Sequence, residues 1–201
     1  MEETKVESSV RVKIFFDEEF TGLHKGTTLI SIGLISETGK TFYAEFNDYA
    51  KDQIDEWLQK NVIDNLKFNH VDDLTPKAAS FNMPGIQDYS LKSDTATIAK
   101  HLKMWLEQFG DVEMWSDCLA YDWVLFNHIF GHAFDIPKNV YYIPFDICTM
   151  FKLLGIDPDI SREKFANYED STEKHNALHD AKVIKLCYEK MQEMLTEGYS
   201  V

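Results

Sequence analysis

The residues most able to do chemistry are carboxylates and a histidine in three separated segments of the chain. Asp17 and Glu19 lie two residues apart after an apolar run, and in an extended strand this spacing puts both side chains on one face. Two such carboxylates can share a hard divalent cation. A solvated acidic turn is the alternative, because the chain contains 34 acidic residues. The end of a central strand is where open sheets usually bind ligands, which favours the metal site.

The other two segments place acids and a histidine at the starts of helices. Asp122 follows a strand-like run and begins a helical pattern, where an acid could also act only as a helix cap. His175 precedes the last helix, and Asp180 lies about one turn inside it, where a metal would give the carboxylate a partner. An unperturbed imidazole titrates near neutral pH, so the side chain of His175 could take a proton from water. His175 and His179 also have the spacing of paired zinc ligands, but residue 176 is Asn where a zinc protease has Glu.

The strands that must position these residues follow from short apolar runs. Residues 10–16 predict a central strand that delivers the acids at its end. Residues 29–36 and 41–46 are separated by a Gly-containing connection, which predicts a hairpin and an antiparallel meander of the first three strands. Later strands are predicted at residues 112–115 and 141–147.

Helices are predicted where apolar residues recur three or four positions apart. They cover residues 52–66, a segment capped by Ser93 or Asp94 and ended by Gly110, residues 122–130, a short helix ending at Leu154, and a last helix from Ala177 to Leu195. Residues 69–92 and 155–174 are predicted to be long loops. These elements predict a mixed α/β fold with helices on both faces of a sheet, in a single domain spanning residues 1–201 with a flexible N-terminus at residues 1–9.

Composition limits the partners of the chain. A formal net charge of −14 argues against a broad basic face for long nucleic acids. Two bound divalent ions would bring the net charge to about −10, which is compatible with the binding of a short substrate end at a metal site. The sequence lacks a secretory signal and a membrane-spanning stretch, so we expect a cytoplasmic protein with no membrane partner. Cys118, Cys148 and Cys187 are predicted to be buried thiols, because their odd number and wide spacing suit neither a disulfide framework nor a zinc cluster.

In type and order, the three segments resemble the motifs of the DEDDh branch of the DnaQ-like 3′-5′ exonucleases, which have an RNase H-like fold. Residues 16–23, Phe-Asp-Glu-Glu-Phe-Thr-Gly-Leu, are similar to the first motif, and Ala-Tyr-Asp122-Trp is similar to the second. His175-x-Ala-x-x-Asp180 matches the third motif. The chain looks most like compact bacterial and phage stand-alone exoribonucleases. It departs from the common pattern at Cys118, where many relatives have Asn.

This resemblance implies a two-metal phosphodiesterase that releases nucleoside 5′-monophosphates from single-stranded RNA 3′ ends. Asp17, Glu19 and Asp180 would hold the first of two Mg²⁺ or Mn²⁺ ions, with Asp17 bridging to the second and Asp122 assisting there. His175 would deprotonate the attacking water. The close alternative is a 3′-5′ DNA exonuclease with the same mechanism, and a different class is a catalytically inactive nucleotide-binding or interaction module.

The resemblance also suggests where the substrate binds. Phe20, Thr21 and Leu23 follow the first motif and are the candidates for contact with the terminal nucleotide, because bases stack on aromatic or apolar side chains. Core packing is the alternative for Phe20. Arg162 lies in the second long loop and is the candidate for a phosphate contact. Relatives of this compact type are often dimeric, so a homodimer is a further expectation.

Overall fold

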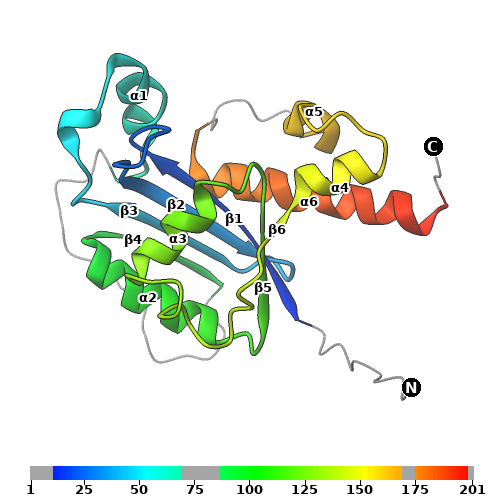
Figure 1. Cartoon of the computed structure of the whole chain (residues 1–201), viewed down its shortest axis with the longest axis horizontal. Helices are drawn as coiled ribbons and strands as arrows, with labels where there is room; N and C mark the ends of the chain where they lie inside the picture. Colours follow the sequence, from blue (N-terminus) through cyan, green and yellow to red (C-terminus); the bar gives the residue numbers. More distant parts are fainter. Residues whose placement is uncertain (1–10, 69–86, 169–174, 199–201) are drawn as a thin grey trace.

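The protein forms one six-stranded mixed sheet, seen in a computed structural model that describes residues 11–68, 87–168 and 175–198 (Figure 1). The predicted flexible segment 1–9 lies outside these residues. The strand order is β4-β3-β2-β1-β5-β6. The bounds are Val12–Phe20 for β1, Leu29–Ser36 for β2, Thr41–Phe46 for β3, Asp88–Ser93 for β4, Val112–Ser116 for β5 and Phe145–Asp146 for β6.

The pairing of the strands confirms the predicted meander. Strands β1, β2 and β3 pair antiparallel in sequence order, whereas β4 pairs parallel with β3, and β5 pairs parallel with both β1 and β6. Helices flank both faces of the sheet, so the predicted mixed α/β class with an antiparallel meander of the first three strands is confirmed.

Six α-helices accompany the sheet within the described residues. They are Glu56–Asn61 for α1, Thr95–Glu107 for α2, Asp122–Ile129 for α3, Ile147–Leu153 for α4, Arg162–Ala166 for α5 and Ala177–Thr196 for α6. Helices α2 and α3 cover one face of the sheet, and α4 and α6 cover the other (Figure 1). No helix in the described part of the chain is long and apolar enough to cross a membrane.

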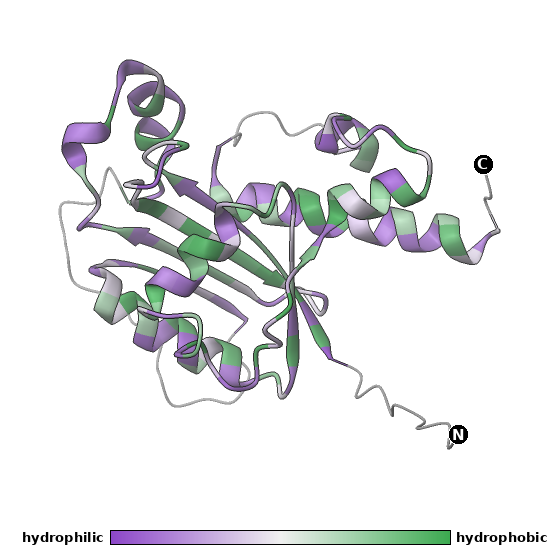
Figure 2. Ribbon diagram, in the orientation of Figure 1, coloured by the Kyte–Doolittle hydropathy of each residue, from purple (hydrophilic) through white to green (hydrophobic). Residues whose placement is uncertain are grey.

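The two faces of β1 belong to two separate cores because successive side chains point in opposite directions. Ile14 and Phe16 pack with α2 and α3, whereas Phe15 packs with α4 and α6. Figure 2 shows the resulting apolar centre of the sheet, with hydrophilic residues on the outer sides of the helices. By the same alternation, Asp17 and Glu19 share the face covered by α6, and Glu18 points toward α3.

Several predicted boundaries are wrong for identifiable reasons. The first strand does not end at residue 16, because Asp17, Glu18 and Glu19 continue the ladder opposite β2. Residues 52–66 are not one helix: the side chain of Asp55 caps α1, and short 3₁₀ turns at Lys51–Gln53 and Ile63–Asn65 flank it. The apolar residues of this segment still form one cluster, so their spacing reported burial rather than a continuous helix.

The two predicted long loops and the last predicted strand also need correction. Residues 88–92 of the first loop belong to β4, where Tyr89 and Leu91 alternate into the core, and residues 69–86 lie outside the described part of the chain. The second loop contains α5, capped by Ser161, and residues 169–174 are not described. The strand predicted at residues 141–147 is reduced to Phe145–Asp146, because Asp146 caps α4 directly after it.

Candidate active site

The acidic end of β1 and the first turns of α6 form the centre of the site. Residue Asp17 pairs with Gly33 of β2 in the antiparallel ladder. A methyl group placed on Gly33 would lie 2.2 Å from the backbone nitrogen of Leu178 and 2.3 Å from the carbonyl carbon of Ala177. The backbone of α6 therefore rests directly on β2, which only a glycine allows at this point. This contact brings Asp180, one turn further along α6, over the carboxylates of β1.

The start of α6 is fixed by a conventional cap. The side chain of Asn176 accepts hydrogen bonds from the backbone nitrogens of Leu178 and His179, at 3.2 and 3.3 Å. Ala177 is fully buried against the sheet. An Asn at this position therefore satisfies the helix terminus, as caps usually do. His179 is buried with its ring beside that of Tyr168, and it does not line the pocket that His175 lines, which does not favour a zinc pair of the two.

Three carboxylates converge tightly enough to hold one cation. Asp17, Glu19 and Asp180 each offer an oxygen, and these oxygens all lie within 4.8 Å of one another. Carboxylate oxygens are hard ligands that suit Mg²⁺ and Mn²⁺. The donor set therefore fits the divalent ions that the sequence implied.

The electrostatics of this cluster also call for a cation. Burial raises the pKa of Asp17 well above its ordinary value, and the nearby carboxylates of Asp180, Asp122 and Glu19 raise it further. Burial, Asp180 and Asp122 raise the pKa of Glu19 to about 8. Without a metal the cluster retains protons at neutral pH, because several buried carboxylates this close cannot all ionise.

Asp122 reaches the same site from the other side of β1. It is the first residue of α3 and is buried, and residue 121 rather than 122 occupies the cap position. Burial raises its pKa to about 7, and a hydrogen bond from the backbone of Glu18 opposes that increase. Its carboxylate faces the other acids rather than serving as the N-terminal cap, which was the alternative left open by the sequence.

His175 stands at the edge of the site, directly before α6. Its backbone has a φ of +62°, in the left-handed region that non-glycine residues seldom adopt. Its imidazole meets the ring of Trp57 from α1 edge-on, with ring centres 5.2 Å apart. Residues with such backbone conformations cluster at functional sites.

All five residues expected to be catalytic line one pocket. Its volume is about 500 Å³, which is within the usual range for small-ligand sites. The lining residues that the sequence singled out are Asp17, Glu19, Phe20, Leu23, Asp122, Arg162, His175 and Asp180. The structure thus brings together residues from β1, α3, α5 and α6.

The expected substrate contacts differ in their surroundings. Leu23 is 75% exposed at the pocket. Phe20 is half-buried and stacks on Tyr121 with ring centres 5.6 Å apart, so it contributes both to the core edge and to the pocket wall. Thr21 is buried outside the pocket lining, and its hydroxyl accepts a hydrogen bond from the backbone nitrogen of Thr28 at 2.9 Å. Its side chain therefore holds the turn after β1.

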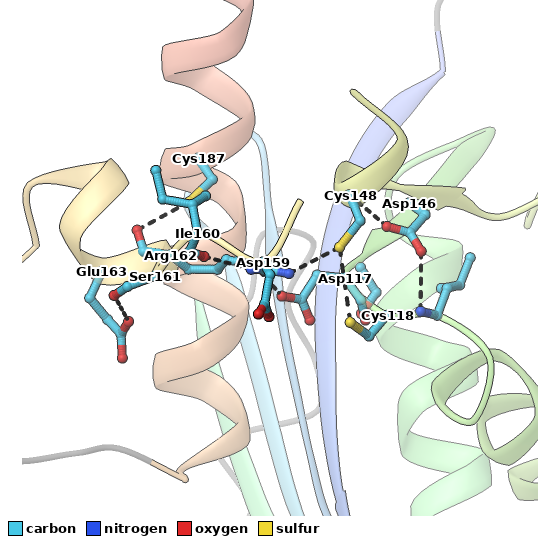
Figure 3. A network of polar contacts seen from close by, with 12 residues as sticks. Asp117, Cys118, Asp146, Cys148, Asp159, Ile160, Ser161, Arg162, Glu163 and Cys187 are labelled. Atoms are coloured by element: carbon cyan, nitrogen blue, oxygen red, sulfur yellow. Dashed lines mark hydrogen bonds and ion pairs between the residues drawn. The ribbon is translucent and has the colours of Figure 1, made fainter. Parts of the chain in front are cut away.

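Arg162 is held by protein groups at the pocket wall (Figure 3). Its Nε donates to Asp117 at 2.7 Å, and its two terminal nitrogens donate to the carbonyl oxygen of Ile160 at 2.6 Å and to the sulfur of Cys148 at 3.0 Å. Among the described pocket residues it is the one Lys or Arg. Its position on α5 ties that helix to the end of β5.

Four acidic residues that line the pocket were not predicted as site residues from the sequence: Glu18, Asp117, Asp159 and Glu163. Asp117 lines the pocket directly after β5, and burial raises its pKa even though Arg162 opposes this effect. The signal that identified Asp17, an acid after a strand, also applies to it. Glu18 is buried on the opposite face of β1, and within the described residues neither of its side-chain oxygens has a hydrogen-bond partner. Burial, followed by the charge of Asp122, raises its pKa.

The prediction of three buried cysteines is only partly right. Cys187 is buried, but Cys148 is intermediate and Cys118 is exposed. Cys118 occupies the turn that follows β5 at the pocket wall, where the chain leaves the core before α3 begins.

The chain is similar to proteins that are already known. Residues 12–192 match the family model described as the 3′-5′ exoribonuclease Rv2179c-like domain. Among solved structures, the chain is similar to the Neurospora crassa Pan2 catalytic unit, which contains a protease and a nuclease domain. The identity is 19% and the TM-score 0.48, with 96% of this chain and 29% of that chain covered. No curated protein sequence matches the chain.

Proposed function

The chain belongs to the Rv2179c-like 3′-5′ exoribonuclease domain family, and from this premise we propose that it is a two-metal exoribonuclease. It would shorten single-stranded RNA from the 3′ end and release nucleoside 5′-monophosphates. The observation that carries the proposal is the convergence of Asp17, Glu19 and Asp180, whose oxygens lie within 4.8 Å of one another in a pocket that also contains Asp122 and His175.

Each residue has a role that its position supports. Asp17, Glu19 and Asp180 would hold one divalent ion, and Asp17 and Asp122 would hold a second. Ions bound there would activate a water molecule and neutralise charge on the leaving oxygen. His175, at the open edge of the pocket, would accept the proton of the attacking water. The carboxylates would be ionised only with metal present, because their raised pKa values favour the protonated forms without it.

The pocket wall offers surfaces for the terminal nucleotide. Leu23 is exposed, and the stacked rings of Phe20 and Tyr121 form an apolar surface beside it. A base can stack on such groups whatever its identity. Thr21 would act indirectly by shaping the turn that carries Leu23. Arg162 lines the same wall, so its guanidinium would attract a substrate phosphate while it remains paired with Asp117.

RNA is the favoured substrate because of the family to which the chain belongs. A DNA exonuclease with the same mechanism is the alternative, since the choice depends on whether the site binds the 2′-hydroxyl. A homodimer and a cytoplasmic place of action remain predictions, which light scattering of the purified protein and localisation of the tagged protein would test.

The deciding experiment compares 5′-labelled single-stranded RNA and DNA of matched sequence, with Mn²⁺, Mg²⁺ or a chelator. A metal-dependent ladder that shortens from the 3′ end is expected for RNA. Asp17→Ala should abolish it. Asp52→Ala is the matched control, because it removes an exposed carboxylate outside the pocket. Cleavage by Asp17→Ala at the wild-type rate would refute the metal assignment, and no cleavage of either strand by the wild type would favour a nucleotide-binding module.

A further inference from the structure

Two cysteines from distant parts of the chain meet beside the active-site pocket (Figure 3). The sulfur atoms of Cys118 and Cys148 are 4.0 Å apart. Cys118 lies in the turn after β5, is exposed and lines the pocket, whereas Cys148 is in the first turn of α4. This pair could not be predicted from the sequence, because 30 residues separate the two positions.

Two side chains hold the segments that carry these cysteines together. The carboxylate of Asp146 accepts a hydrogen bond from the backbone nitrogen of Cys148 at 2.6 Å and another from that of Leu119 at 3.3 Å. Arg162 donates to Asp117 at 2.7 Å and to the sulfur of Cys148 at 3.0 Å. Each bridge links one cysteine to a direct neighbour of the other. The proximity of the two sulfurs is therefore fixed by the surrounding structure.

The backbone conformation of Cys118 also indicates that the surrounding structure fixes the position of this residue. Its φ is +47°, in the left-handed region where non-glycine residues are uncommon. A residue in this conformation persists only where the surrounding structure enforces it. Here the conformation belongs to a turn that directs the thiol of Cys118 toward Cys148 (Figure 3).

We propose that Cys118 and Cys148 are a modification site that forms a reversible intramolecular disulfide and thereby controls the activity of the adjacent pocket. A disulfide bond is about 2.05 Å long, so the sulfurs must approach each other by about 2 Å. The third cysteine is excluded from the reaction, because Cys187 is buried and its thiol donates to the carbonyl oxygen of Arg162 at 3.4 Å.

The oxidant is a small-molecule disulfide such as oxidised glutathione. The exposed sulfur of Cys118 attacks it, forms a mixed disulfide and releases one reduced thiol. The sulfur of Cys148 then attacks the Cys118 sulfur, forms the internal bond and releases the second thiol. The two protein thiols lose two electrons and two protons, and the small disulfide gains them. Burial raises the pKa of each protein thiol, that of Cys148 to about 12, so each thiol loses its proton as it attacks, and the released small-molecule thiolate takes the proton up.

The effect on activity rests on the proposed function and follows from what the bond would displace. Closing the bond draws the turn after β5 toward α4 and weakens the contact of Arg162 with Cys148. The same turn leads to Tyr121, which stacks on Phe20 in the pocket wall, and then to Asp122. A shift of about 1 Å in a positioned group can cost about 10²-fold in rate, so we expect the oxidised protein to lose roughly tenfold or more.

The test treats the full chain with oxidised glutathione or with a reductant. Non-reducing peptide mapping by mass spectrometry should find a Cys118–Cys148 link in the oxidised wild type. RNA cleavage should fall with oxidation and recover on reduction. Cys187→Ser is the matched control and should respond like the wild type. Cys148→Ser should stop at the mixed disulfide on Cys118, and the double variant Cys118→Ser, Cys148→Ser should cleave RNA equally well in oxidised and reduced samples.

In the wild type, a mixed disulfide that stops at Cys118, a link between two chains, or no modification would each overturn the proposal. A complete internal link with unchanged cleavage would overturn the control of activity. The mapping does not depend on catalysis. If the reduced protein cleaves no RNA, the proposed function fails, while the peptide map still decides whether the disulfide forms.

Discussion

Replacement of Gly33 by Ala should disturb both stability and catalysis, because this residue sets how closely α6 approaches the sheet. The added methyl group would lie 2.2 Å from the backbone nitrogen of Leu178 and 2.3 Å from the carbonyl carbon of Ala177. Carbon atoms in good contact are about 3.5–4.0 Å apart, so the helix or the strand must move by roughly 1 Å or more. Backbone atoms make up this contact, and a rotamer change cannot relieve it.

The size of the effect follows from that displacement. Overpacking a core costs about 1–3 kcal/mol, and a clash with backbone belongs at the upper end. For a chain of this size, about 3 kcal/mol lowers the melting temperature by roughly 6–12 °C. The same shift moves Asp180 away from Asp17 and Glu19, whose oxygens now lie within 4.8 Å of its own. A misplacement of about 1 Å can reduce turnover about 10²-fold.

Urea unfolding and RNA cleavage with Mn²⁺ would measure the two effects. Gly26→Ala is the matched control, because the same methyl group would there meet only the side chain of His24 at 3.6 Å, an ordinary contact. If Gly33→Ala unfolds at the same urea concentration as Gly26→Ala and cleaves RNA at the same rate, the close approach of α6 does not position the site. Lost stability with full turnover would show that the carboxylates tolerate the shift.

Four other perturbations test the charges and surfaces of the site. The pKa of Glu19 is raised from 4.5 to about 8, so between these pH values the folded metal-free protein binds a proton that the unfolded chain releases. The melting temperature of the metal-free protein should therefore fall as pH rises from 4.5 to about 8, and Mn²⁺ should make this fall less steep. A melting temperature that does not change with pH in the metal-free protein would contradict this. Asp17→Asn should abolish turnover and raise the melting temperature of the metal-free protein at high pH. Calorimetric unfolding measures this melting temperature. His175→Ala should lower turnover about 10²–10⁴-fold with Mn²⁺ affinity largely kept in titration calorimetry, whereas lost affinity would make the residue a ligand. Leu23→Ala should raise KM for RNA without changing stability, because the side chain is 75% exposed, and an unchanged KM would remove it from the substrate surface.

The candidate site could be predicted from the sequence because its key spacings are local. Asp17 and Glu19 share a face of β1 through the two-residue period of a strand, and Asp180 follows His175 by a fixed step into a helix. The contact that joins these two pieces could not be predicted in the same way. It depends on Gly33, which the local pattern marks only as a glycine within an apolar strand, and on the backbone of Ala177 far along the chain.

The boundary errors have a common physical origin, since apolar spacing reports which residues are buried and not where the backbone changes conformation. Leu58 and Val62 are buried in one cluster as their spacing suggested, yet the cap formed by Asp55 starts α1 late and a 3₁₀ turn follows it. The acids of β1 were predicted to follow the strand at its end, with a solvated turn as the alternative. They remain in the ladder because β2 supplies their backbone partners.

The acidity of the chain, which argued against a broad basic face for long nucleic acids, is consistent with the structure of the site. Asp17, Glu19, Asp122 and Asp180 are concentrated in one pocket with Asp117, and burial is the largest cause of the raised pKa of each member for which the shift is resolved. Such a cluster destabilises the metal-free fold at neutral pH, because its members would otherwise ionise in water. The β1–β2 ladder and the close packing of α6 must therefore offset the free-energy cost of burying these carboxylates. Divalent cations bound in this pocket would offset its negative charge, so a substrate phosphate would meet metal ions there rather than bare carboxylates.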